Sequence, residues 1–332
     1  MLVPWLSGHA GPAAVCAVLF LAFLANVLLG DPAVRFRRIP HPTVLVGRAI
    51  AAGDRRFNRP TDSARVRRWT GGALALAVVL GSGAVGWALT RVLAFPGGAL
   101  AESVVAATLL SHTGLFVAVR RVADALAQGL EPAQRAVTAL VSRDPRMLDA
   151  HGVARAAAES AAENFGDGVV APALWYVALG LPGLFAYKAL NTLDSMIGYR
   201  TARHRDFGRV AARLDDAANW PGARLAALLI VAGALVTPGA RPVRALAVAW
   251  TQAHRHRSVN AGWPEGALAG ALDFRLAGPR SYAGAAVADT WIGDGRGDLT
   301  PADLRRVLRL FAASTAMLTG SLGAAALGMW LT

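Results

Sequence analysis

The feature that most constrains this chain is a set of long apolar runs, each long enough to cross a lipid bilayer as a helix. A spanning helix needs roughly 20 predominantly apolar residues. The clear runs cover residues 11–30, 71–95, 98–118 and 307–331, and weaker ones cover 168–187 and 223–239. The sequence therefore predicts an all-α, polytopic integral membrane protein with about four to six membrane segments, some of them re-entrant.

Composition supports a membrane protein with substantial polar loops. Hydrophobic residues make up 55% of the 332 residues, and charged residues make up 17%, below the usual quarter of a soluble domain. Cys16 is the single cysteine, so no intrachain disulfide can form. No Lys or Arg precedes the first apolar run, which favours a retained membrane helix over a signal peptide. We expect one membrane-embedded catalytic domain over residues 1–332.

The cations predict the topology. Net charge is +13, and the arginines lie mostly between apolar runs, which is typical of cytoplasmic loops and argues against nucleic-acid binding. Segment 31–70 holds ten arginines against three acids and is expected in the cytoplasm. Residues 71–118 then form a hairpin with an external turn at FPGG. Basic segments flank 168–187 on both sides, so we expect it, like 223–253, to dip into the bilayer and return.

Polar motifs concentrate in the loops between these runs, over 30–70, 119–167, 188–222 and 251–300. Within 156–168, the segment AAAESAAENFGDG places Glu159 and Glu163 on one helical face, which Asp167 continues. Mg²⁺ commonly takes one or two carboxylates together with substrate phosphates, so this face is a candidate magnesium site. A solvated acidic face, relieved by Arg155 one turn earlier, explains the pattern equally well.

The segment YKALNTLDSMIGYR, residues 187–200, carries Lys188, the only lysine among 34 Lys and Arg residues. On a helix, Lys188, Asn191 and Ser195 lie near one face, and Asp194 lies beside them. A cation at a membrane boundary is the alternative explanation, but arginine fills that role elsewhere in this chain. A compact ammonium suits a phosphate or carboxylate oxygen, so we favour a functional role.

Two further segments pair acids, amides and cations. ARLDDAANWPGAR, 212–224, puts Asn219 one turn after Asp215, while Asp216 points elsewhere, and Arg213 and Arg224 offer anion-binding forks. A polar helix entering the membrane, anchored by Trp220, explains this segment equally well.

The segment HRHRSVNAGWPEGALAGAL, 254–272, contains His256 and Asn260 and suggests a loop that contacts anions or amides. His254 and His256 are two residues apart, a spacing that does not make a shared metal site on a helix. Near the N-terminus, Asp31 and His41 follow the first apolar run in a proline-stiffened loop. The chain has no G-x-x-x-x-G-K-[ST] loop, so any use of ATP proceeds without a Walker motif.

Together these segments closely resemble the adenosylcobinamide-phosphate synthases of cobalamin biosynthesis. The segments GDP, HPTVLVG and AVTALVSRDPRMLD fit the same family, and the likeness runs in the family's order from about residue 25 to 285. One departure is SVN at 258–260, where the family pattern has SPN.

The resemblance implies an inner-membrane, multi-pass ligase with its active site facing the cytoplasm. It would join adenosylcobyric acid to (R)-1-amino-2-propanol phosphate or a related amino alcohol, with ATP as co-substrate and Mg²⁺ as cofactor. Expected partners besides these substrates are the lipid bilayer and either a second copy of the chain or other corrin-pathway enzymes, with no nucleic acid.

The resemblance also suggests roles for the motif residues. The expected metal or amine contacts are Glu159, Glu163 and Asp167. The expected cations for phosphate charge are Lys188, Arg213 and Arg224. Further catalytic residues are Asp194 and Asp215, and further substrate contacts are Asp31, His41, Asn164, Asn191, Ser195, Tyr199, Asp216, Asn219, His256 and Asn260.

Other functions fit parts of the pattern. A transporter of a polar or anionic small molecule would explain broken segments near the membrane, but it predicts inverted repeats, which the sequence does not display. A membrane alcohol-phosphotransferase with paired aspartates and magnesium is a second alternative. A purely structural membrane subunit leaves the polar motifs unexplained.

Overall fold

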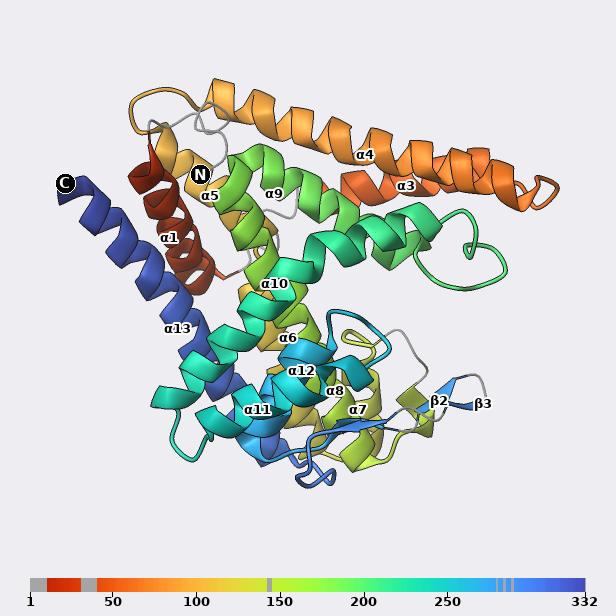
Figure 1. Ribbon diagram of the computed structural model, residues 1–332, viewed down its shortest axis with the longest axis vertical. Coiled ribbons are helices and arrows are strands. Elements are labelled where there is room, and N and C mark those ends of the chain that lie inside the picture. The colour runs from red at the N-terminus through yellow and green to blue at the C-terminus, as the bar shows by residue number, and fades with distance from the viewer. Residues whose placement is uncertain are drawn as a thin grey trace. The chain divides into compact units, whose positions relative to one another are not determined.

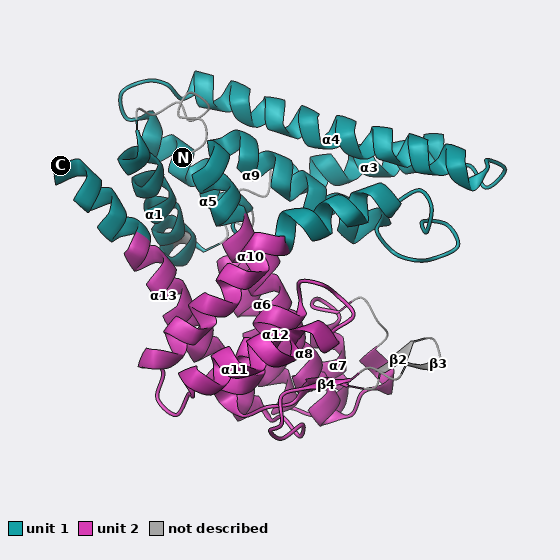
Figure 2. Ribbon diagram, viewed as in Figure 1, with its two compact units in different colours: residues 1–110, 172–219, 322–332 teal, residues 111–171, 220–321 magenta. Residues whose placement is uncertain are grey.

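The computed structural model describes residues 11–30, 41–141, 145–278, 280–282, 285–287 and 290–331. Helices make up nearly all of the regular structure in these residues. The chain divides into two compact units (Figure 2), unit 1 with residues 1–110, 172–219 and 322–332, and unit 2 with residues 111–171 and 220–321. The chain therefore passes between the units four times. The single catalytic domain expected from the sequence stays a prediction.

Unit 1 is built from helices alone, as far as the described residues show (Figure 1). Its elements are α1 (Pro12–Leu29), α3 (Pro42–Phe57), α4 (Ala64–Val92), α5 (Gly98–Leu109), most of α9 (Ala171–Ile197), the start of α10 (Arg209–Val236) and the last turns of α13 (Pro301–Leu331). The side-chain amide of Asn26 in α1 donates to the backbone oxygens of Ala107 and Leu110, at 2.9 and 3.0 Å, and so fixes α1 against α5.

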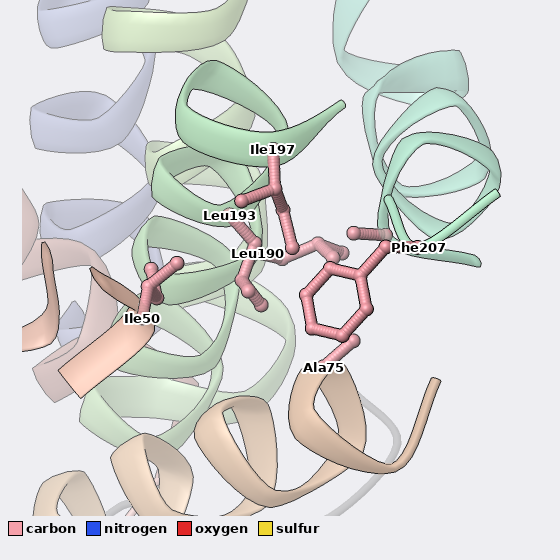
Figure 3. Close-up of a cluster of buried hydrophobic side chains, with 7 residues drawn as sticks. Ile50, Ala75, Leu190, Leu193, Ile197 and Phe207 are labelled. Atoms are coloured by element: carbon pink, nitrogen blue, oxygen red, sulfur yellow. The ribbon is translucent and has the colours of Figure 1, made fainter. Parts of the chain in front are cut away.

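A buried apolar cluster joins four helices of unit 1 (Figure 3). It contains Ile50 of α3, Ala75 of α4, Leu190, Leu193 and Ile197 of α9, and Phe207 and Ala211 near the start of α10. A Cβ atom on Gly71 would lie 1.9 Å from the backbone oxygen of Phe207, so only glycine allows this approach. The cluster holds the polar ends of α9 and α10 in place.

Charged side chains fasten the loop after α9 to α3 and α4. Arg203 donates to Asp54 at 2.7 Å, and Arg68 pairs with Asp206 at 2.8 Å. Burial raises the pKa of Asp54, but hydrogen bonds from Asn58 and Arg203 outweigh burial, so the pKa lies below its ordinary value. Asp54 is therefore charged at neutral pH and holds the loop electrostatically.

Unit 2 combines short helices with two small sheets. Its elements are α6 (His112–Leu126), α7 (Leu130–Val137), η1 (Pro145–Met147), α8 (Ala150–Phe165), η2 (Gly166–Val170), the end of α10, α11 (Pro242–Gln252), η3 (Ala253–Arg255), α12 (Gly262–Leu272), β1 (Leu276–Ala277), β2 (Arg280–Tyr282), β3 (Ala285–Val287), β4 (Trp291–Ile292) and most of α13. Strand β1 pairs antiparallel with β4, and β2 with β3.

Five helical stretches among the described residues are long and apolar enough to cross a membrane. They are Ala64–Val92, Gly98–Leu126, Ala150–Ile197, Arg209–Val236 and Pro301–Leu331, and Pro12–Leu28 is a shorter apolar helix. The prediction of an all-α, polytopic membrane protein is confirmed.

Two predicted segments are interrupted. The run 98–118 was expected as one helix, but α5 ends at Leu109, because Leu110 is extended and the Ser111 N–H donates to Gly168 instead. The run 168–187 bends inside α9 at Gly180, whose φ of 67° is outside the helical range. Pro182 follows the bend and cannot donate a helical hydrogen bond, so the bend follows from the backbone preferences of glycine and proline.

Candidate functional site

In unit 1, the polar ends of α9 and α10 form a connected hydrogen-bond chain. The Tyr187 hydroxyl donates to Asn219 Oδ1 at 2.6 Å, and Asn219 Nδ2 donates to Asp215 Oδ2 at 2.8 Å. Asn191 also lies within hydrogen-bonding reach of Asp215. All of these side chains except Asn191 are buried. The two motifs that the sequence places far apart thus meet through one carboxylate and two amides.

Three carboxylates gather around this chain. Asp194 of α9 interacts electrostatically with Asp215 and Asp216 of α10, and the interaction is repulsive. Arg200, just beyond α9, attracts Asp216. Like charges so close favour a bound cation or a bound cationic group between them. The prediction that Asp215 and Asp216 need not share one ligand is untested by these contacts.

Lys188 directly follows Tyr187 in α9, and only 9% of the residue is exposed. An ammonium group in this position is expensive to bury unless oxygen atoms surround it. Ser195 follows two turns later, but its hydroxyl donates to the Asn191 backbone oxygen at 2.8 Å and so is used within the helix. Tyr199 and Arg213 are both exposed.

The N-terminal motif contributes differently. Asp31 lies outside the described residues. The imidazole of His41 accepts from the Thr43 backbone N–H at 3.2 Å and lies 2.9 Å from the Thr108 backbone oxygen through its Nε2 atom. His41 therefore caps α3 and connects it to the end of α5, a structural role beside the predicted substrate contact.

In unit 2, α8 carries the acidic motif and continues without a break into the π-helical turn η2. Glu159 is buried, and its Oε1 accepts from the Ala277 backbone N–H at 2.8 Å. Glu163 is exposed, and Asp167 lies half-buried in η2. Asn164 donates to the Ser160 backbone oxygen at 2.8 Å. Single π-turns inside helices are frequent at functional sites.

The magnesium prediction concerns Glu159, Glu163 and Asp167 of this motif. Among the described residues, no three His, Cys, Asp or Glu side chains lie close enough together to enclose a metal ion. Mg²⁺ usually keeps several waters and takes one or two carboxylates plus phosphates, so an open pair suits it better than a closed cage. Glu163 is exposed and Asp167 half-buried on the next turn, while one carboxylate oxygen of Glu159 accepts from the backbone of β1. The role of Mg²⁺ stays a prediction.

Arg224 anchors the loop before α12. Its guanidinium donates to Asn260 Oδ1 at 2.8 Å and to the Val259 backbone oxygen at 3.1 Å. It also lies 4.5 Å from the centroid of Trp220 and 4.7 Å from that of Trp263. These contacts use most of the guanidinium's donors, so Arg224 positions the predicted loop of Asn260.

Within that loop, the predicted contact His256 faces a buried acid. His256 Nε2 lies 3.6 Å from Glu265 Oε1, and its Nδ1 accepts from the Ser258 N–H at 3.0 Å. The Ser258 hydroxyl accepts from the backbone N–H groups of Asn260 and Ala261, which orders the entry to α12. These turn contacts join the side chain of Ser258 to backbone N–H groups, so the side chain in the middle of SVN takes no part in them.

The contacts add residues that the sequence reasoning did not select. Tyr187 directly precedes Lys188, and Arg200 is the last residue of the same segment, 187–200. Glu265 lies inside the segment 254–272. All three therefore belong to segments already selected, and a comparison of which residues share a helical face could have found them. Arg155 and Arg275 lie 5.2 and 4.9 Å from the centroid of Trp291, and this contact has no local sequence signal.

Comparisons with known proteins match nearly the whole chain. The family model described as CobD/Cbib protein matches residues 19–311. The cobalamin biosynthesis protein CobD of a Sinorhizobium species is 48% identical over 92% of this chain and 96% of its own length. The CobD proteins of Brucella anthropi and Rhizobium meliloti are 44% and 43% identical, over 93% and 96% of this chain and 96% and 99% of their own lengths. No solved structure matches the chain significantly.

Proposed function

This chain belongs to the CobD/Cbib family of cobalamin biosynthesis proteins, and from that premise we propose that it is an ATP-dependent amide ligase. The proposed reaction joins a carboxylate of adenosylcobyric acid to the amine of (R)-1-amino-2-propanol phosphate and yields adenosylcobinamide phosphate. The names of the relatives state a role in cobalamin biosynthesis but do not name a reaction, so the ligase reaction goes beyond those names. The proposal also places the protein in the inner membrane, with this chemistry on the cytoplasmic side.

The observation that carries the proposal is the polar group on α9 and α10. It brings two amides and three carboxylates together, and the only lysine of the chain lies in the same stretch of α9, directly after Tyr187. An amide ligase handles phosphate, carboxylate and amine groups in one place. Lys188 suits an anionic oxygen, the carboxylates suit an amine, and Asn191 and Asn219 suit neutral amides.

The chemistry requires activation because a carboxylate does not condense with an amine unaided. Transfer of the γ-phosphoryl group of ATP to the carboxylate oxygen gives an acyl phosphate and ADP. The amine then attacks the carbonyl carbon, the bond to the phosphate oxygen breaks, and the amine loses a proton. Lys188 would stabilise the negative charge that develops on phosphate, and Asp215 or Asp194 would accept the proton.

When bound, Mg²⁺ would neutralise phosphate charge, with Glu163 and Asp167 as the residues that would hold it. Arg224 would keep Asn260 oriented toward a substrate amide or carboxylate. An acyl phosphate hydrolyses if water reaches it, and the buried positions of Tyr187, Asp215 and Asn219 are consistent with a site that limits water access.

The test uses detergent-purified protein with ATP, magnesium, adenosylcobyric acid and aminopropanol phosphate, with the corrin product followed by mass. We compare wild type with Lys188→Arg, and with Arg65→Lys, an exposed cation at the start of α4, as the matched control. The proposal predicts product from wild type and from the control, with product from Lys188→Arg reduced at least about tenfold, or roughly 1.4 kcal/mol.

Equal product from all three proteins would keep the ligase and remove Lys188 from its site. No product and no substrate-dependent ATP cleavage by any of them, with alternative amines also tried, would contradict the ligase and favour a transporter.

A further inference from the structure

Helix α11 of unit 2 is apolar on two opposite sides. Its inner side, with Ala245, Val248 and Ala249, is buried. This side packs closely on α12, because a Cβ atom on Gly270 would lie 2.3 Å from the Arg244 backbone oxygen, and one on Gly266 would lie 3.0 Å from the Ala249 Cα atom. Small residues that let two backbones approach in this way are typical of helix pairs in membranes.

The outer side of α11 is exposed and also apolar. Val243, Leu246 and Trp250 are 82%, 45% and 73% exposed, and their spacings of three and four residues place them in one stripe. A helix at a water-facing surface carries polar residues on that stripe. The ring of Trp263 contacts that of Trp250 edge-on, with centroids 5.9 Å apart, but the described part of the chain leaves all three side chains of the stripe exposed, so they require another apolar environment.

The length of α11 decides how it meets a bilayer. Eleven residues extend about 16 Å as a helix, roughly half of a 30 Å hydrocarbon core, so α11 is too short to span. It follows α10, one of the candidate spans, after a short turn. The last turn of α10 exposes Leu235 and Val236, at 71% and 58%. In the sequence, the outer stripe of α11 thus comes directly after the exposed apolar end of a candidate spanning helix.

Both ends of α11 are basic. Arg241 and Arg244 lie at its start, each 3.3 Å from Asp273, while exposed His254 and Arg255 follow its end. Tryptophan and arginine beside an apolar stripe are characteristic of helices at the level of lipid headgroups. Anionic phosphates complement these cations, which favours lipid over a second protein as the occupant.

We propose that α11 is an in-plane helix at the bilayer interface. Val243, Leu246 and Trp250 enter the outer part of the acyl chains, and the basic ends lie at the level of anionic headgroups. This site for lipid is independent of the ligase reaction.

Spin labels on single cysteines test the depth. In a Cys16→Ser background, we label Val243→Cys and Leu246→Cys, with Leu80→Cys on the exposed face of α4 as the deep reference and Asp298→Cys as the aqueous reference. Each protein is placed in nanodiscs of phosphatidylcholine and phosphatidylglycerol, one copy per disc. Collisions with oxygen, enriched in lipid, and with a water-soluble nickel chelate give the depth. Ala247→Cys, also exposed on α11, replaces a variant that does not fold.

The proposal predicts oxygen-to-nickel collision ratios for α11 several-fold above that of Asp298 and below that of Leu80. The α11 ratio falls when phosphatidylglycerol is left out, because fewer anionic headgroups hold the basic ends. A ratio equal to that of Asp298 would place α11 in water and overturn the proposal. Shielding of α11 from both reagents would indicate a protein partner. A collision ratio equal to that of Leu80 would indicate a deeply inserted segment. Either result would contradict an interfacial helix.

Discussion

At the scale of single residues, Asp215 combines a stabilising contact with a repulsive one. Asn219 donates to its carboxylate, while Asp194 repels it. The substitution Asp215→Asn keeps the shape and removes the repulsion, so we expect an unchanged or higher melting temperature. We also expect product formation to fall at least about tenfold, or roughly 1.4 kcal/mol, because the amide accepts no proton. Thermal unfolding in detergent and the corrin product assay measure the two effects.

A lower melting temperature for Asp215→Asn would mean that the charge stabilises the fold, through a cation held between the acids. Unchanged product would remove Asp215 from the reaction.

Arg224 uses its planar fork, which lysine does not have. The substitution Arg224→Lys keeps the charge but loses at least one of the hydrogen bonds to Asn260 and Val259 and weakens the stacking between the two indoles. We expect a loss of about 1–3 kcal/mol in the free energy of unfolding and a red shift of tryptophan emission as the indoles become wetter. Denaturant unfolding followed by fluorescence measures both.

Arg209→Lys, an exposed cation on the same helix, serves as the control and should change neither quantity. If both variants behave like wild type, the Arg224 contacts do not order the loop.

Sequence spacing predicts local neighbours well and tertiary partners poorly. The pairing of Asp215 with Asn219 follows from one helical turn and is present in the structure. The role of Arg224 differs from a free anion-binding fork, because its partners come from a loop some 35 residues later in the chain. Likewise, Glu159 has the spacing of a metal ligand, but a backbone N–H from β1 occupies one of its oxygens.

At the scale of elements, Asp54 connects α3 to the loop after α9. Its pKa is lowered by Asn58 and Arg203 in the folded protein. The contact therefore stabilises the fold above the ordinary Asp pKa of about 3.9 and is lost as the pH falls through the lowered value. We expect Asp54→Asn to reduce the free energy of unfolding at pH 7 by about 1 kcal/mol, and less as the pH falls below about 4.

Denaturant unfolding of wild type and variant over this pH range measures the difference. A difference that stays constant or grows toward acid would show that the Asp54 charge is not the stabilising group.

Some helix boundaries follow from the backbone preferences of the local residues, whereas others depend on tertiary contacts. The bend of α9 at Gly180 and Pro182 follows from their own backbone preferences, so the sequence shows it. The end of α5 at Leu109 does not, since apolar residues continue past it. A hydrogen bond from Ser111 to Gly168, in a π-turn that no periodicity predicts, separates α5 from α6.

At the scale of the whole molecule, the arginine distribution makes a topological prediction. The basic loop around Thr61 should be cytoplasmic, and the turn at Pro96 should be external. In a Cys16→Ser background, Pro96→Cys should react with a membrane-impermeant maleimide in intact cells, and Thr61→Cys only after permeabilisation. Both positions are exposed, so burial does not account for a lack of reaction. The reverse labelling pattern would mean that the protein has the opposite orientation in the membrane. Equal labelling of both positions would contradict the predicted hairpin of residues 71–118.

The apolar runs were sufficient to predict an all-α membrane protein, because helix length and hydropathy are properties of the local chain. They did not predict two compact units, which depend on which distant helices pack together. Each unit takes residues from both halves of the sequence, so no composition change marks its limits.

The position of the single lysine has a practical consequence for proteolysis. A protease specific for lysine can cut this chain at one peptide bond, between Lys188 and Ala189, and that bond lies inside a buried helix. Proteases need an extended, accessible substrate, so cleavage into fragments 1–188 and 189–332 requires α9 to open. The native sequence thus contains its own reporter of local opening at the site, which a gel can follow without any label.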